Sequence, residues 1–308
     1  MQKKIPSTLS KILRVLGCTF LLFGSESAGA ASYDLTLRGL GRPAPNKTND
    51  PAFLRYRSLI NELAMAAAPR LLGPAETIGA SGFEFAFVNT FADIHQDAAY
   101  WQGQAGSPVF RGVASGEGVP SGLWIPTMQI RKGLPFSSEL GLTGSYLAFS
   151  EMFFLGTDFK IAIHESYYRW VPSFALRASI GSLFNANDVK ITTAEIDTIT
   201  SLPIGISGVF ELVPYLGFGL LYVDAISQVI DETPYEVKDQ SIDQNGQTNG
   251  SLYVFDRIQW YNNQSKRFFI GMKAKYAFLQ VAYELTLGAV PNIDSLLQSH
   301  SLKIGFDI

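Results

Sequence analysis

Apolar and polar side chains alternate along the chain from about residue 82 to the last residue. At the C-terminal end, Leu302, Ile304 and Phe306 fall on one face of an extended chain, and Lys303 and Asp307 fall on the other. Successive side chains of a strand point to opposite faces, so this pattern predicts strands with one apolar face. We expect ten strands, within a range of eight to twelve, at about 82–92, 121–132, 137–148, 152–164, 171–183, 191–207, 212–226, 267–276, 279–288 and 299–308.

The connections between these strands favour a closed barrel. The long connections at about 93–120, 227–266 and 289–298 all follow odd-numbered strands, whereas the turn at 133–136 follows an even one. An even number of strands with short turns at one end and long loops at the other is typical of barrels in bacterial outer membranes, where closure leaves no open edge in hydrocarbon. The predicted fold class is therefore all-β, a transmembrane antiparallel β-barrel, with both ends of the mature chain on the periplasmic side.

A helix is predicted before the first strand. Asp50-Pro51 is a typical start, Tyr56, Leu59 and Leu63 recur at helical spacing, and Pro69 ends the pattern. This helix, at about 51–68, could fill the barrel mouth as a plug or lie on the periplasmic rim. A helix docked outside, or a mobile tether, is the alternative.

The N-terminus has the pattern of a secretory signal peptide. Basic residues precede an apolar run at 15–23 and the small residues of Ala28-x-Ala30. Lipoprotein cleavage before Cys18 is disfavoured, because it would leave an apolar stretch on the mature side. The predicted organisation is a signal peptide at 1–31, an N-terminal extension at 32–78 and a barrel at 79–308, located in the bacterial cell outer membrane.

Removal of residues 1–31 would remove Cys18, the only cysteine, and leave 20 basic and 26 acidic residues. A net charge near −6 gives no support to nucleic-acid binding, and three dispersed histidines give little support to a metal site or cofactor. The acidic link at 227–266 does not have the spacing of an EF-hand, and an acidic solvated loop is the default interpretation. Aromatic clusters at 100–101, 167–170 and 260–261 predict rings at the membrane interface.

Three stretches carry a family resemblance: 214–222 (Pro-Tyr-Leu-Gly-Phe-Gly-Leu-Leu-Tyr), the strand with Gly271 and Lys273, and the closing strand. The chain is similar there to small outer-membrane β-barrel proteins of the OmpA/OmpW-like kind. The resemblance implies a barrel fold and an outer-membrane location. The chain ends at Ile308, where the family's signal for the barrel-assembly machinery usually ends in an aromatic residue, although Phe306 could serve.

Projection of the strands places seven acidic and seven basic residues on the inward, lumen-facing side. They are Glu84, Arg131, Glu139, Asp158, Lys160, Arg177, Glu195, Asp197, Arg267, Lys273, Lys275, Glu284, Lys303 and Asp307. A barrel of ten strands is narrow, and opposite charges within it should pair. These residues predict either a narrow, charge-lined conduit or an ion-paired core that only fills the barrel.

The sequence therefore predicts a non-enzymatic, porin-like membrane protein. Its role would be a narrow channel or transporter of small or apolar solutes, or a structural barrel that contacts a partner at the cell surface. The enzyme alternative is a lipid-modifying hydrolase, similar to lipid A deacylases that use a His-x-Ser on a strand. Here that motif would be His164 and Ser166, which project to the same face, but the following tyrosines do not continue that family's motif.

Overall fold

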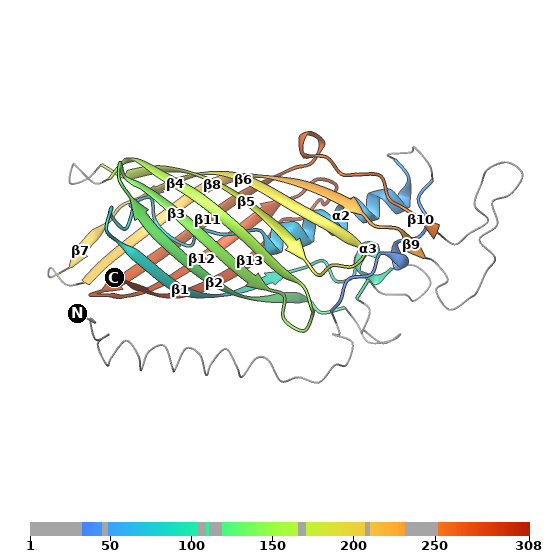
Figure 1. Ribbon diagram of the computed structural model, residues 1–308, viewed down its shortest axis with the longest axis horizontal. Helices are drawn as coiled ribbons and strands as arrows, with labels where there is room; N and C mark the ends of the chain where they lie inside the picture. The colour runs from blue at the N-terminus through green and yellow to red at the C-terminus, as the bar shows by residue number, and fades with distance from the viewer. Residues whose placement is uncertain are drawn as a thin grey trace, which may run out of the picture.

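The computed structural model describes residues 33–44, 49–103, 109–110, 119–165, 171–206, 210–231 and 252–308. Ten strands in it form one closed antiparallel barrel (Figure 1). They are β1 (Phe83–Asp93), β2 (Gly122–Leu134), β3 (Ser138–Tyr146), β4 (Phe153–His164), β5 (Ser173–Phe184), β6 (Val189–Ser201), β8 (Phe210–Ser227), β11 (Gln264–Tyr276), β12 (Leu279–Ala289) and β13 (Leu297–Asp307). The predicted fold class and strand number are confirmed.

The barrel closes where β13 pairs with β1, so the prediction that the last strand pairs with the first is confirmed. β1 pairs with β13 in register from Glu84↔Asp307 to Ala92↔Ser299, and the N–H of Phe83 donates to the carbonyl of Ile308 at 2.9 Å. β8 and β11 pair over thirteen residues, from Gln264↔Tyr222 to Tyr276↔Phe210. No barrel strand is left with an unpaired edge among the described residues.

The sixth predicted strand, at 191–207, is wrong in its second half. β6 ends at Ser201, and Ile204–Ile206 forms a separate short strand, β7, that pairs with the start of β8. Pro203 lies between the two strands, where it has no N–H to give to a ladder. A two-stranded ribbon, β9 (Ile230–Asp231) with β10 (Leu252–Tyr253), lies outside the barrel sheet.

The predicted helix is α2 (Pro51–Ala67), and its start is capped as expected. The side chain of Asp50 accepts hydrogen bonds from the N–H groups of Ala52 at 3.0 Å and Phe53 at 3.3 Å. One further α-helix, α3 (Ala99–Gln102), and two short 3₁₀ helices, η1 (Arg38–Leu40) and η2 (Trp260–Asn262), are described. None of the described helices is both long and apolar enough to cross a membrane.

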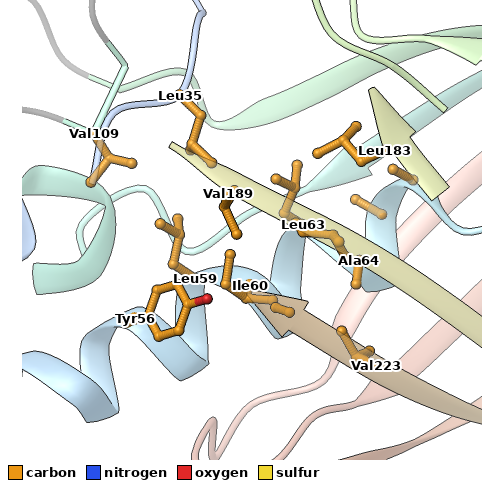
Figure 2. Close-up of a cluster of buried hydrophobic side chains, with 14 of the residues drawn as sticks. Leu35, Tyr56, Leu59, Ile60, Leu63, Ala64, Val109, Leu183, Val189 and Val223 are labelled. Atoms are coloured by element: carbon orange, nitrogen blue, oxygen red, sulfur yellow. The ribbon is translucent and has the colours of Figure 1, made fainter. Parts of the chain in front are cut away.

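α2 lies in the mouth of the barrel, at the end opposite the C-terminus (Figure 1). It is buried along most of its length, with Leu59 and Ile60 fully covered. Figure 2 shows its apolar side chains among Leu183 of β5, Val189 of β6 and Val223 of β8. The larger of the two hydrophobic clusters of the described residues is therefore inside this end of the barrel.

The first described residues lie at the same end as α2. The N–H of Tyr33 donates to Phe149, in the link between β3 and β4, and the N–H of Leu37 donates to Asp188, in the link between β5 and β6. Both links are at the far end of the barrel from Ile308. The expectation that both ends of the mature chain lie at the same end is therefore wrong. From α2 the chain runs through the barrel to reach β1.

Candidate functional site

Burial along the strands alternates with the period of two that the sequence predicts. The outward side chains are large, apolar and exposed, such as Leu142, Ile163, Ile196, Phe218 and Ile270. The inward ones include eleven of the fourteen predicted charges, each at most 3% exposed: Glu84, Arg131, Glu139, Asp158, Lys160, Arg177, Glu195, Asp197, Arg267, Glu284 and Lys303. Lys273, Lys275 and Asp307 are half-buried, close to the C-terminal end of the barrel.

Two arginines are at the centre of the charged interior. Arg131 forms a two-pronged pair with Asp158, at 3.0 and 2.9 Å. Arg177 reaches Asp197 at 2.5 Å and Glu195 at 3.4 Å, and its Nε lies 3.5 Å from Asp158. Isolated charge is costly to bury, so these partners are what permits full burial. The guanidinium of Arg177 therefore joins β4, β5 and β6.

Most of the other predicted charges extend this network or form separate pairs: Glu139 lies 3.6 Å from Arg131, and Glu195 is shared by Arg177 and Arg267. Lys160 lies 3.1 Å from Glu139, and Lys303 lies 2.5 Å from Glu84. Arg267 pairs with Glu195, and Lys275 lies 2.6 Å from Asp307. Glu284 accepts hydrogen bonds from Tyr215 at 3.1 Å and Thr286 at 3.2 Å.

Glycines make room for the pairs that reach across a strand. Gly141 of β3 stands in register between Arg131 and Asp158, and a Cβ there would lie 2.5 Å from a carboxylate oxygen of Asp158. Gly219 of β8 stands in the same way between Asp197 and Arg267. The Gly217-x-Gly219 pair thus lies in a strand, where it allows close packing.

Residues 68–78, here called the inner segment, run from α2 through the barrel to its other end. They meet the wall charges mainly with backbone carbonyls. Arg177 donates to the carbonyl of Pro69 at 3.1 Å, and Lys160 donates to those of Pro74 at 3.1 Å and Glu76 at 2.7 Å. These contacts extend the hydrogen bonding of side chains that already have ionic partners on the wall.

Side chains fix the inner segment at both ends. Arg70 donates to Ser299 at 2.7 Å and Ser301 at 3.3 Å, and is the basic residue that the segment adds to the barrel interior. At the other end, the N–H and hydroxyl of Thr77 donate to Glu165 at 2.6 and 2.5 Å, and Ser137 donates to the same carboxylate at 2.7 Å. Partial burial acts to raise the pKa of Glu165, but these hydrogen bonds hold the pKa below its ordinary value.

The space left beside the inner segment is small. One cavity of about 10 Å³ is lined by Arg70, Thr127, Gln129 and Ser145, and another of about 10 Å³ by Met65, Arg70, Thr286 and Ser299. Each is about the size that holds a single water molecule. Neither cavity has room for a solute larger than water, so the inner segment and the wall side chains fill the barrel around Arg70.

The inner segment was not recognised as part of the site from the sequence. Its residues lack strand or helix periodicity, and their main contacts use backbone atoms that a side-chain pattern does not report. Pro69, which ends the helical pattern, and the conformation of Leu72, with φ of 44°, are the local signs of a change in direction. Gln129 and Ser201 also bind the segment, at the carbonyl of Arg70 and the N–H of Ala75.

The histidine–serine candidate is only partly described. His164 ends β4 at an irregularity in the pairing with β5, and Ser166 and the aromatic cluster at 167–170 lie outside the described residues. The neighbouring Glu165 binds Thr77 and Ser137. Residues 232–251, half of the acidic link at 227–266, also lie outside the described residues, and no group of three or more metal-binding side chains occurs among the residues that are described.

The prediction that the aromatic ring of Trp101 lies at the membrane interface is wrong. This ring is fully buried at the loop end of the barrel, stacked on Phe110 with centroids 5.1 Å apart. Tyr261 is 77% exposed, on η2.

The closed ten-stranded sheet, its apolar outer wall and its charged interior form one architecture. The chain has the fold of an outer-membrane β-barrel protein. No family model and no curated protein matches it.

Solved structures with a similar barrel include three from different bacteria. The chain is 13% identical to the N-terminal β-barrel domain of Pseudomonas aeruginosa OprF, with a TM-score of 0.28, covering 75% of this chain and 99% of that one. It is 12% identical to LpxR from Salmonella typhimurium, with a TM-score of 0.32, covering 72% and 99%. It is 9% identical to the Acinetobacter baumannii outer membrane protein Omp33, with a TM-score of 0.28, covering 77% and 100%.

Proposed function

We propose that this protein is an outer-membrane barrel that forms a narrow, charge-lined conduit for small solutes, closed by its own N-terminal segment. α2 fills the loop end of the conduit, and the inner segment fills its length. The observation that carries the proposal is the division of contacts: wall charges pair mainly with one another, whereas the inner segment contributes mainly neutral backbone groups.

This division separates a removable plug from a permanent core. If the inner segment moves out, Arg131 keeps Asp158, Lys160 keeps Glu139 and Lys303 keeps Glu84. Water can replace the carbonyls of Pro69, Pro74 and Glu76 as acceptors at little cost, because a hydrogen bond exchanged with water is worth only about 0.5–1.5 kcal/mol net. The wall would then remain paired and become wetted.

The outer wall supports a location in lipid. Its exposed side chains include phenylalanine, leucine and isoleucine on consecutive strands around the barrel, which in water would form an apolar patch far beyond that of an ordinary soluble protein. In a bilayer the same surface contacts hydrocarbon, and the closed sheet satisfies its backbone hydrogen bonds internally. Lipid is therefore the proposed partner of the wall, and β13 is the proposed contact for the barrel-assembly machinery after export by a cleavable signal peptide.

Current through planar bilayers tests the proposal. The full chain, refolded and inserted, should be closed without denaturant and should show discrete openings in urea concentrations that release the inner segment but leave the barrel folded, since the segment pairs with no strand whereas each barrel strand pairs with two neighbours. Hydrogen exchange at 68–78 would report release. Silence in urea, with the segment released and the barrel intact, would contradict the conduit and favour a core that only fills the barrel.

A further inference from the structure

A second polar cluster lies at the loop end, apart from the charged interior. It brings together a serine, a histidine and a glutamate from three separate parts of the chain. Glu62 is on α2, His95 follows β1, and Ser295 is in the link between β12 and β13. None of the three belongs to the wall charges or to the inner segment.

The three side chains form a continuous hydrogen-bonded series. The Ser295 hydroxyl is hydrogen-bonded to Nε2 of His95, and Nδ1 of the same ring lies 3.1 Å from Oε1 of Glu62. A carboxylate at Nδ1 stabilises the tautomer with its proton on that nitrogen, which leaves Nε2 as the acceptor for the serine proton. This is the relation of nucleophile, base and orienting carboxylate that acyl transfer requires.

Glu62 is held in place as an orienting group should be. Its side chain is fully buried, and it also accepts from the N–H of His95 at 2.8 Å and from Nε1 of Trp101 at 3.0 Å. Burial and the neighbouring Glu62 carboxylate raise the pKa of Tyr100. A buried carboxylate is costly without such donors, and here the donors fix both of its oxygens.

The reactive end of the series is open to solvent. Ser295 is exposed, and the side chain of His95 is 30% exposed. The next residue, Leu296, is 60% exposed, and Phe91, on the outer wall of the adjoining strand, is 55% exposed. Phe91 is in register with His300, on the strand that begins directly after the Ser295 link, so an acyl chain in the surrounding bilayer would meet the wall at this rim.

We infer that Ser295, His95 and Glu62 form a hydrolase site for carboxylic esters with apolar acyl groups, presented at the loop-end rim of the barrel. Ser295 and His95 are the catalytic residues, and Glu62 is a positioning residue. The site is separate from the charged interior, shares only α2 with the proposed plug, and lies at the opposite end of the barrel from His164.

The reaction has two balanced steps. Ser295 Oγ bonds to the carbonyl carbon while its proton moves to His95 Nε2; the carbon–oxygen bond to the alcohol then breaks, and that proton leaves with the alcohol. Water next attacks the acyl-serine, gives one proton to Nε2, and releases the carboxylic acid as the proton returns to Ser295 Oγ. No oxidant or reductant is needed.

Labelling with a fluorophosphonate tests the nucleophile in the full, folded chain. We expect one adduct, on the peptide that contains Ser295, absent in Ser295→Ala and formed at least tenfold more slowly in His95→Ala. Matched controls are Ser121→Ala, an exposed serine of another loop-end link, and His300→Ala, whose ring contacts Tyr283 at 2.7 Å and Gln298 at 2.8 Å. An unlabelled Ser295 in folded protein, or labelling independent of His95, would overturn the inference.

Ester turnover tests the substrate and the role of Glu62. p-Nitrophenyl laurate in detergent micelles should be cleaved with a higher kcat/KM than p-nitrophenyl butyrate; equal values would overturn the apolar acyl preference. Glu62→Gln should lower kcat by about 10³- to 10⁴-fold with KM nearly unchanged, as when a triad carboxylate becomes an amide. Glu62→Asp should restore part of it. A folded Glu62→Gln protein with unchanged kcat and pH profile would show that Glu62 is only structural.

Discussion

Gly219 shows how much of the barrel interior is decided by single residues. Its missing side chain leaves the space through which Arg267 and the carboxylates of Asp197 and Glu195 approach one another. At Gly219, as at Gly141, the strand in between has no side chain on the inward face, and the charged groups on either side can meet across it. Charge pairing in this protein therefore depends on glycine positions as well as on the charged residues.

Replacement of Gly219 by alanine should destabilise the barrel by about 1–3 kcal/mol, because the new Cβ would collide with Asp197 and lie 3.0 Å from Glu195. Gly205 is the matched control, since a Cβ there has no atom within 4 Å. Denaturant unfolding in detergent, followed by tryptophan fluorescence, measures both variants. Equal stability of the two would contradict the close approach.

Glu165 makes the inner segment sensitive to acid. Because the pKa of Glu165 is lowered in the folded state, its stabilising effect is complete above the ordinary glutamate pKa of about 4.3 and is lost as the pH falls through the lowered value. Exchange of the Thr77 amide should therefore accelerate, relative to intrinsic exchange, below about pH 4.3. In Glu165→Gln this acid-dependent step should be absent, and a step of the same size in that variant would contradict it.

The inward position of the charged residues could be predicted from their sequence parity alone, but their partners could not. Glu139 and Lys160 face each other directly in register, whereas Arg131 reaches Asp158 two strands away past Gly141. Such a contact depends on register and on a glycine gap, which one sequence does not specify. The hydrolase site was missed for a related reason: Glu62, His95 and Ser295 are far apart in sequence and belong to no motif.

At the scale of elements, α2 has the bounds that its pattern predicts because cap, apolar period and Pro69 act locally. Its direction is not local. The helix runs inward from the loop end, so the chain before it lies beside the links rather than at the turn end. Periodicity gives the apolar face of a helix, but which surface covers that face depends on tertiary packing.

Leu63→Ala should loosen α2 without opening the barrel. Leu63 is 1% exposed in the cluster of Figure 2, and truncation of such a side chain costs about 2–5 kcal/mol. Hydrogen exchange should increase throughout α2 and little in β1 or β13. Leu54→Ala, at a half-buried position of the same helix, should have a smaller effect. Protection of α2 unchanged by Leu63→Ala would contradict its role as the packed plug.

At the scale of the whole molecule, a closed wall surrounds a threaded segment. The wall is held by strand pairing and its own ion pairs, and the segment by α2, Arg70 and Glu165. The number of strands and their closure could be predicted because alternation and link lengths are global regularities of the sequence. The path of residues 68–78 could not, because space inside the barrel, not local propensity, determines it.

A reversible lock on the inner segment tests whether this segment closes the conduit. The N–H of Ala75 lies 2.9 Å from Oγ of Ser201, so cysteines at these positions should be near enough to form a disulfide. Cys18, the only native cysteine, precedes the expected cleavage site. In urea, the Ala75→Cys/Ser201→Cys double variant should be silent in planar bilayers when oxidised and should show discrete openings after reduction, while Ser201→Cys alone opens in both conditions. Equal currents from the oxidised and reduced forms, or no current from either, would contradict a conduit closed by its N-terminal segment.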